Sequence, residues 1–330
     1  MRIGIKAIEY EVPKNVLSNQ ELAELYGDWS AEKIFNKTGI ESRHIADENE
    51  VASDLAERAA IKLFDTGIVK PEEIDFILLA TQSPDYLLPT TACLLQSRLG
   101  IPQTAGALDF NLGCSAYIYG LALAKGLILA GIAKNILFLT AETYSKYVHP
   151  LDKSTRTIFG DAAAATIVCA DAPYVLGEFD LGTNGAGGDT LIVPVGGAKQ
   201  RTSTLPPNEP QKAKSELNLH MAGSEVFEFT IRVVPESVKK VLLKNDLRLD
   251  DVDLFVFHQA NKFMLDFLRK KSKIPKDKFY INMADIGNTV SPTIPIALKR
   301  AQEEKRLLPG HKVLLSGFGV GLSWGSIILR

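Results

Sequence analysis

Residues 108–131 read LDFNLGCSAYIYGLALAKGLILAG, and this stretch changes character at Cys114. An apolar run that suits a strand precedes the cysteine, and a long Ala- and Leu-rich run that suits a helix follows it. A cysteine at such a junction is either small core packing or a nucleophile at a helix start. Gly113 on one side and Ser115 and Ala116 on the other leave room for a ligand. We therefore treat Cys114 as a candidate nucleophile whose thiolate the helix N-terminus would stabilise.

Short apolar runs that suit strands buried on both faces recur along the chain. They are FILLA at 76–80, ILFLT at 136–140, LFVFH at 254–258 and VLLSGF at 313–318. Helical patterns lie between them, for example at residues 52–64, where one face is apolar. This alternation predicts an α/β protein with helices covering the sheets.

An internal repeat divides the chain into two halves. The segment PEEIDFILLATQSPDYLLPTTACLLQSRL (71–99) resembles LDDVDLFVFHQANKFMLDFLRKK (249–271) in its acidic start, buried strand, polar turn and helix. We predict two duplicated α/β halves, residues 1–172 with Cys114 and residues 173–330. The Gly- and Pro-rich residues 182–215 are expected to form long surface loops.

Composition and cysteine usage exclude several classes of protein. The 330 residues are 46% hydrophobic and carry a formal net charge of -2, so neither nucleic acid nor a membrane surface is an expected partner. No secretory signal begins the sequence, and residues 117–133 contain Lys125 and are too short to span a bilayer. Cys93, Cys114 and Cys169 are odd in number and widely spaced, which predicts no disulfide framework, no metal site and a cytoplasmic location. We expect Cys93 and Cys169 in the core.

Two further polar residues occur where strands should end in the second half. VFHQAN places His258 after a buried strand, and Asn288 follows Gly287 at a turn. Taken singly, a core histidine and a Gly-Asn turn explain them. If the halves pair, both residues join Cys114 at one site. Papain-like hydrolases use the same residue types in the same order, but their C-G-S-C-W context is absent from LGCSAY here.

The motifs GCSA, HQAN and GNT with a following IP resemble the 3-oxoacyl-acyl-carrier-protein synthase III branch of the thiolase-like condensing enzymes. KTGIESRHIA (37–46), IFGDAAAA (158–165), HMAGSEVF (220–227) and GFGVGLSWGS (317–326) resemble further family landmarks in family order. The resemblance implies a five-layer αβαβα fold of two like halves, usually a homodimer, and no cofactor beyond the thioester substrates. It also implies an acyltransferase of fatty-acid biosynthesis that performs a decarboxylative Claisen condensation with malonyl-acyl carrier protein.

The resemblance assigns roles to the three candidate residues. Cys114 would hold the acyl primer, and His258 and Asn288 would donate hydrogen bonds to the extender thioester. Loss of CO2 leaves an enolate, which neutral donors in a dry site stabilise and a carboxylate would repel. The backbone N–H groups of Cys114 and of the turn at Gly319 and Val320 would form the oxyanion hole.

The sequence departs from the family at the entrance. Relatives that take a CoA primer carry a Trp and an Arg where Lys33 and Lys37 stand here. We keep Lys37 as a contact for a CoA or phosphopantetheine phosphate, and interpret Trp29 as a buried helix residue. With the stacking partner missing, we expect an acyl carrier protein to deliver the primer.

Two surface features follow from the resemblance. Leu88 aligns with a residue, often Phe, that bounds the acyl pocket from the partner subunit. Arg269, Lys270 and Lys271 lie on a predicted helix after His258 and are expected to dock an acidic carrier protein.

Other functions remain open. The Cys-bound acyl group could pass to an amine or hydroxyl, the condensation could serve a specialised pathway, or the chain could be a non-catalytic partner of a heterodimeric synthase. Retention of all three candidate residues argues against that last alternative. The acyl primer is not specified by the sequence.

Overall fold

A computed structural model describes residues 2–201 and 217–330. Within them, the strands of the main sheet follow the order β12-β11-β13-β14-β8-β1-β7-β6-β4-β5. Their bounds are β1 Ile3–Glu11, β4 Phe76–Ala80, β5 Gly106–Phe110, β6 Asn135–Glu142, β7 Ala162–Ala170, β8 Tyr174–Thr183, β11 Leu254–Phe257, β12 Phe279–Tyr280, β13 Val313–Gly319 and β14 Ser323–Leu329.

The sheet consists of two runs of strands with the same order. From edge to centre, β5-β4-β6-β7-β1 matches β12-β11-β13-β14-β8. In both runs the outer strands are parallel and the inner ones antiparallel. The runs meet where β1 pairs with β8 through Gly4↔Val175 and Ile5↔Tyr174. The repeated segments 71–99 and 249–271 each form a short 3-10 helix, a strand and a helix, so the structure confirms that they share one plan. The division at residue 172 stays a prediction.

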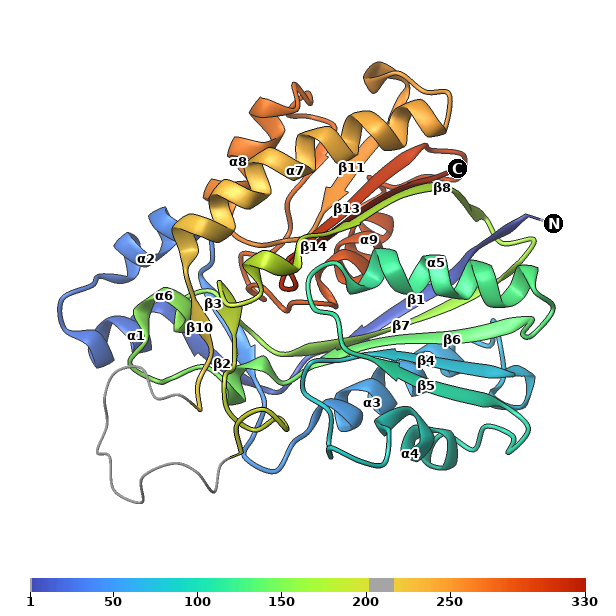
Figure 1. Cartoon of the computed structure of the whole chain (residues 1–330), viewed down its shortest axis with the longest axis horizontal. Helices are drawn as coiled ribbons and strands as arrows, with labels where there is room; N and C mark the ends of the chain where they lie inside the picture. Colours follow the sequence, from blue (N-terminus) through green and yellow to red (C-terminus); the bar gives the residue numbers. More distant parts are fainter. Residues whose placement is uncertain (1, 202–216) are drawn as a thin grey trace.

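Six helices cover the sheet and separate its two runs, which gives the expected five layers (Figure 1). Helices α3 (Ala52–Asp65) and α4 (Thr91–Arg98) pack on the outer face of the first run. Helices α5 (Ala116–Leu129) and α9 (Thr293–Glu303) lie between the runs, and α7 (Gly223–Lys244) and α8 (Lys262–Lys271) cover the second.

Helix α5 is the central helix that begins beside Cys114. Its side chains are buried on several faces because sheet strands lie on both sides of it. Gly120 brings its backbone against Phe138, where an added Cβ would lie 2.1 Å from the ring. The small residue therefore fixes how closely the helix approaches β6.

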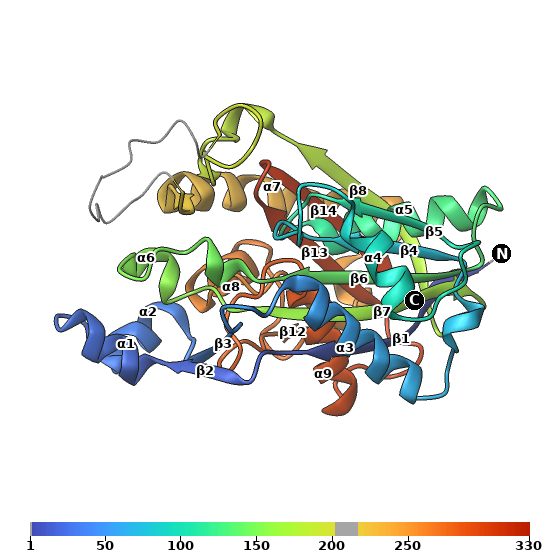
Figure 2. The same cartoon turned by 90° about the horizontal axis from the view of Figure 1, so that it is seen from below.

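Smaller elements form a cap at one end of the sheet (Figure 2). They are β2 Asn15–Ser18, α1 Asn19–Tyr26, α2 Ala31–Thr38, β3 Ser42–Ile45 and α6 Lys153–Arg156. The fully buried Arg43 guanidinium donates to the Leu17 carbonyl, the Asn19 side chain and the Thr157 carbonyl. These bonds hold the cap against the segment that lines the site described below.

Two sequence expectations fail in the fold. Residues 182–215 do not form only surface loops: β9 (Leu191–Ile192) pairs with β10 (His220–Met221), and Leu191 and Val195 are buried in the wall of a pocket. Residues 202–215 lie outside the described part. Cys93 is exposed, since it faces outward on α4, whereas Cys169 is buried as expected.

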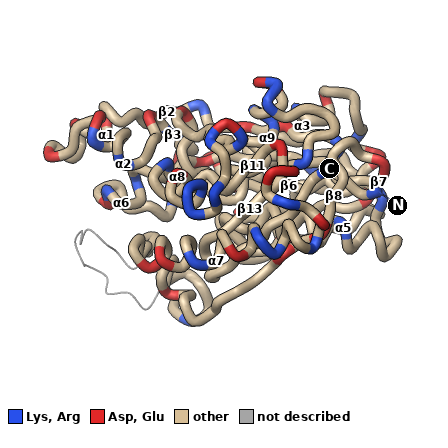
Figure 3. Tube along the Cα trace, turned by 90° about the horizontal axis from the view of Figure 1, so that it is seen from above, with Lys and Arg blue, Asp and Glu red and all other residues tan. Residues whose placement is uncertain are grey.

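Positively and negatively charged residues are mixed along the chain. Figure 3 shows Lys and Arg interspersed with Asp and Glu along the trace. In the described part of the chain, no helix combines the length and the apolar character that crossing a bilayer requires.

Candidate active site

Cys114 lies between the end of β5 and the start of α5, with Ser115 as the N-cap. The residue is buried, and its sulfur lies against Gly319 at the end of β13. An added Cβ at Gly319 would lie 2.9 Å from Sγ, so only glycine permits this approach. Val320 follows, and its backbone N–H and that of Cys114 hydrogen-bond the sulfur. The two donors expected for an oxyanion hole therefore lie beside Cys114.

The protonation state of Cys114 differs from the expectation. Burial is the largest influence and raises the pKa of the thiol to about 12, with a further contribution from the nearby Glu142. The two backbone N–H groups oppose this rise but do not outweigh it. The apolar neighbours include Tyr144, Phe159 and Leu191. The expectation of a thiolate in the resting protein is wrong because desolvation exceeds the effect of the helix start.

His258 follows β11, and its ring is enclosed. Its backbone N–H donates to the Ser316 carbonyl, which continues the ladder to β13. Burial lowers the pKa of the imidazole to about 3, so the ring is neutral at neutral pH. The ring atom Nδ1 lies 2.7 Å from Oγ1 of Thr293, and that hydroxyl lies 3.0 Å from the Val290 carbonyl. The single hydroxyl proton of Thr293 thus decides which ring nitrogen carries the proton.

Asn288 lies in the turn between β12 and α9. Its backbone N–H donates to the Ile158 carbonyl, and its carbonyl accepts from Gly160, so the segment is tied to the first half of the chain. The side-chain oxygen accepts from the backbone N–H of Val290 at 2.9 Å. This bond orients the amide and leaves its NH2 group as a donor.

The structure brings Cys114, His258 and Asn288 to one cavity of about 200 Å³. Its other walls are mostly apolar: Ile158, Phe159, Leu191, Met221, Gly223, Val226, Thr230, Ala260, Asn261, Met264, Phe318 and Gly319. A nucleophile from one half and two neutral polar side chains from the other thus share a dry site. The apolar walls alone disfavour charge, so His258 and Asn288 are the groups that could stabilise negative charge that develops there.

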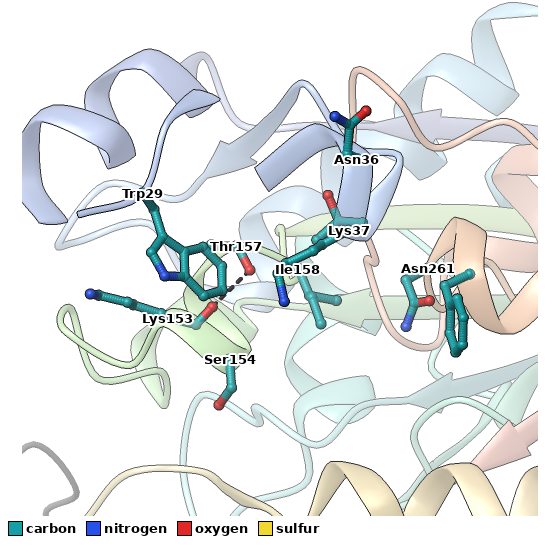
Figure 4. A pocket seen from close by; sticks show the side chains of 10 residues that line it. Trp29, Asn36, Lys37, Lys153, Ser154, Thr157, Ile158 and Asn261 are labelled. Atoms are coloured by element: carbon teal, nitrogen blue, oxygen red, sulfur yellow. Dashed lines mark hydrogen bonds between the residues drawn. The ribbon is translucent and has the colours of Figure 1, made fainter. Parts of the chain in front are cut away.

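An entrance pocket of about 480 Å³ adjoins this cavity through Ile158 and Asn261 (Figure 4). Trp29 and Lys37 line it, and Lys153 lies close to the indole. The ammonium groups of Lys33, Lys37 and Lys153 lie 5.0, 5.3 and 5.9 Å from the Trp29 ring. The interpretation of Trp29 as a buried helix residue is wrong, because it lies in the turn between α1 and α2.

A second pocket of about 470 Å³ lies beyond the nucleophile. It shares Leu191 with the central cavity, and Tyr144 and Val320 in its wall pack in the same cluster as Cys114. Its wall also has a polar strip, in which the Tyr144 hydroxyl donates to Gln82 and the Gln82 amide donates to Asn111. The central cavity therefore adjoins a pocket through Leu191 as well as the entrance pocket through Ile158 and Asn261.

The remaining predicted residues lie outside the central cavity. Leu88 is 82% exposed and lines none of these three pockets in its own chain. Lys270 and Lys271 are exposed on the last turn of α8, whereas Arg269 is half-buried and donates to the Ile274 carbonyl. In residues 2–201 and 217–330, no group of His, Cys, Asp or Glu side chains could hold a metal ion.

Sequence reasoning missed three residues of the site. Of these, only Glu142 has a signal in the sequence: it ends the apolar run NILFLTAE, where an acidic residue is unusual. Thr293 and Leu191 have no local signal, because a Thr before an apolar helix suits a cap and Leu191 lies in an apparent loop.

Comparisons with known proteins agree with this geometry. Residues 108–185 match the family model of 3-oxoacyl-[acyl-carrier-protein] synthase III, and residues 242–330 match the model of its C-terminal part. The chain is 36% identical to a beta-ketoacyl-[acyl-carrier-protein] synthase III of Caldanaerobacter subterraneus subsp. tengcongensis, over 99% of this chain and 97% of that protein.

Solved structures give the same result. A crystal structure of a 3-oxoacyl-(acyl-carrier-protein) synthase III matches with a TM-score of 0.96 and 49% identity, covering 100% of this chain and 99% of the other. The 3-oxoacyl-(acyl-carrier protein) synthase of Burkholderia xenovorans LB400 matches with a TM-score of 0.92 and 34% identity, covering 100% and 94%.

Proposed function

Because the chain belongs to the 3-oxoacyl-[acyl-carrier-protein] synthase III family, we propose that it is an acyltransferase of fatty-acid biosynthesis. It condenses a Cys114-bound acyl primer with malonyl-acyl carrier protein, releases CO2 and forms a 3-oxoacyl thioester. The observation that carries this proposal is the cavity in which Cys114 faces the neutral His258 and Asn288.

In the first step, the Cys114 sulfur attacks the carbonyl carbon of an acyl thioester. The carrier thiol leaves with the proton that Cys114 gives up, and the acyl group stays on the sulfur. The N–H groups of Cys114 and Val320, which bond the sulfur, would hold the oxyanion of the tetrahedral intermediate. The close contact at Gly319 keeps that strand beside the reacting carbon.

In the second step, the malonyl thioester loses CO2, and the electrons of the broken C–C bond form an enolate. His258 and the Asn288 amide donate to its oxygen without a change in their own charge. The Thr293 hydroxyl donates to the Val290 carbonyl at 3.0 Å, so for His258 to donate from Nε2 that hydroxyl must rotate and donate to Nδ1 instead. The enolate carbon then attacks the acyl carbonyl, and the Cys114 thiolate leaves.

The entrance pocket supports delivery by either carrier. Trp29 offers a face for an adenine ring, and Lys33, Lys37 and Lys153 offer positive charge for phosphates of CoA or phosphopantetheine. Lys270 and Lys271 would meet an acidic carrier protein, whereas the Arg269 side chain is turned to its own helix end. The position of Trp29 in the entrance pocket argues against the expectation that CoA would have no stacking partner.

The second pocket is the proposed binding site for the acyl chain. The exposed Leu88 would complete it from the partner subunit of a homodimer. A cytoplasmic location is part of the proposal and rests on three unpaired cysteines.

The test is the intact mass of the protein after exposure to acyl-CoA and acyl-carrier thioesters, with Cys114→Ala as control. A mass gain that the Ala variant lacks, followed by CO2 release and a 3-oxoacyl product on addition of malonyl-carrier protein, is the expected result. Acylation without CO2 release would instead favour transfer to an amine or hydroxyl acceptor.

A further inference from the structure

Glu142 is a carboxylic acid in the interior of the molecule, at the last residue of β6, and its exposed fraction is 0%. Three groups hold it. Its Oε2 accepts from the Gln82 backbone N–H at 3.0 Å and from the Ser83 hydroxyl at 3.2 Å, and Oε1 lies 2.7 Å from the Ser291 hydroxyl. All three partners are uncharged.

These bonds join the segments on both sides of the chemistry. Gln82 follows β4, and its side-chain oxygen lies where a Cβ on Gly113 would come within 2.4 Å, directly before Cys114. Ser291 belongs to the other half, in the turn between Asn288 and Thr293. Thr293 in turn contacts His258. The carboxyl group of Glu142 is thus a side-chain link between the nucleophile's surroundings and the donor segment, in addition to the backbone bonds of Asn288 to Ile158 and Gly160.

The titratable groups around Glu142 are acids. A negative charge on Glu142 raises the pKa of Cys114, Tyr144 and Tyr147, and the charge of Asp161 raises the pKa of Glu142. Burial is the main reason why the pKa of Glu142 is raised to about 8, and its hydrogen bonds lower that pKa only in part. A carboxylate here would oppose both a thiolate on Cys114 and the enolate beside it.

We propose that Glu142 is a positioning residue whose carboxyl group fastens the Asn288–Thr293 segment to the half of the chain that carries Cys114. The Ser291 hydroxyl donates to Oε1, and the Gln82 N–H and the Ser83 hydroxyl donate to Oε2, so the carboxyl group joins the two halves in either protonation state. In its neutral form it also spares Cys114 a nearby negative charge. The role in decarboxylation rests on the proposed function, whereas the effect on Cys114 does not.

The sign of the pH effect follows from linkage. The folded protein keeps the Glu142 proton up to about pH 8, and an unfolded chain loses it near the ordinary value of 4.5. The folded state therefore binds more protons in this range, and Glu142 makes the free energy of unfolding fall as pH rises through it. Above about pH 8, the ionised Glu142 carboxylate also opposes thiolate formation by Cys114.

The test uses Glu142→Gln, which keeps a donor and an acceptor but cannot ionise. Iodoacetamide alkylation of Cys114 is followed by intact mass from about pH 6 to about pH 10, where thiolate formation controls the rate. Cys114→Ala corrects for Cys93 and Cys169, and Asp180→Asn, another buried carboxyl group, is the matched control.

The expected result is that Glu142→Gln alkylates faster than the wild type, by roughly threefold to tenfold above pH 8, and that the gap closes at lower pH. Asp180→Asn should follow the wild type. Superimposable curves for Glu142→Gln and the wild type, or an equal change in Asp180→Asn, would overturn the proposal. This arm needs no acyl substrate, so a failed condensation assay would count against the reaction and not against Glu142.

A second variant tests the link between the halves. Ser291→Ala removes one bond to Glu142 and should slow CO2 release from the malonyl thioester about tenfold more than it slows acylation of Cys114. Equal effects on both steps, or none, would contradict the positioning role. Thermal unfolding of each variant identifies a general loss of structure.

Discussion

The two halves of the molecule share one strand order but carry different groups at matching strand ends. After β5 the chain carries Cys114 and enters α5, whereas after the matching β12 it carries Asn288 and enters α9. After β4 comes Gln82, and after the matching β11 comes His258. One half supplies the nucleophile and the other supplies neutral donors. The scaffold is repeated, and the residue at each strand end gives the two halves different chemical groups.

The largest expected effect comes from removal of the donors. His258→Ala or Asn288→Ala should lower condensation by about 10²- to 10⁴-fold, because each removes a group that meets the enolate. Acylation of Cys114 should persist, since its N–H donors come from Cys114 and Val320. Mass spectrometry of the acyl-enzyme and measurement of CO2 separate the two steps. An equal loss of acylation would show that His258 and Asn288 also act in the first step.

The second largest effect should come from a change at Gly319, where the second half contacts the sulfur of Cys114. Gly319→Ala places a Cβ 2.9 Å from Sγ, and overpacking of this kind costs about 1–3 kcal/mol. We expect acylation to slow by about tenfold to a hundredfold. Gly126→Ala on α5, where an added Cβ meets nothing within 4 Å, is the control and should leave the acylation rate unchanged. Equal acylation rates in the two variants would mean that the approach at Gly319 is not critical.

A smaller effect should follow from the tautomer of His258. Thr293→Val removes the hydroxyl that contacts Nδ1, and we expect decarboxylation to slow by about tenfold. Thr293→Ser retains the hydroxyl and should restore the rate. Acylation of Cys114, measured in the same preparations, should change little. Failure of Ser to rescue would assign the loss to packing rather than to proton placement.

The smallest effect concerns the outer helices, which also differ between the halves. Arg98 at the end of α4 is paired with Asp54 and Glu57, whereas Lys270 and Lys271 at the end of the matching α8 are exposed. Replacement of both lysines by Glu should raise KM for a carrier-bound thioester severalfold, less so at high salt. A small thioester mimic should be unaffected, and Lys240→Glu on α7 is the exposed control. A similar rise with the mimic would show that the lysines do not act by docking.

The parts of the site that could be predicted are those encoded locally. Apolar runs with a polar residue at the end predicted where Cys114 and His258 leave their strands, and the repeat predicted that both ends face one site. The state of Cys114 could not be predicted, because its burial comes from Tyr144, Phe159 and Leu191, which are distant in sequence. Glu142 has partners 60, 59 and 149 positions away, so its hydrogen bonds exist only in the folded chain. Trp29 was misjudged because a turn, rather than one continuous helix, separates α1 from α2.

The contact between Cys114 and the strand that ends at Gly319 also bears on biosynthesis. More than half of the chain separates the two residues, so a ribosome releases the cysteine long before it makes the glycine and the Val320 N–H beside it. During that interval the sulfur is wetted by solvent and has the ordinary acidity of a free thiol. Electrophiles therefore react with Cys114 most readily in the nascent polypeptide. Once β13 is made and packs against the sulfur, the thiol is shielded from them.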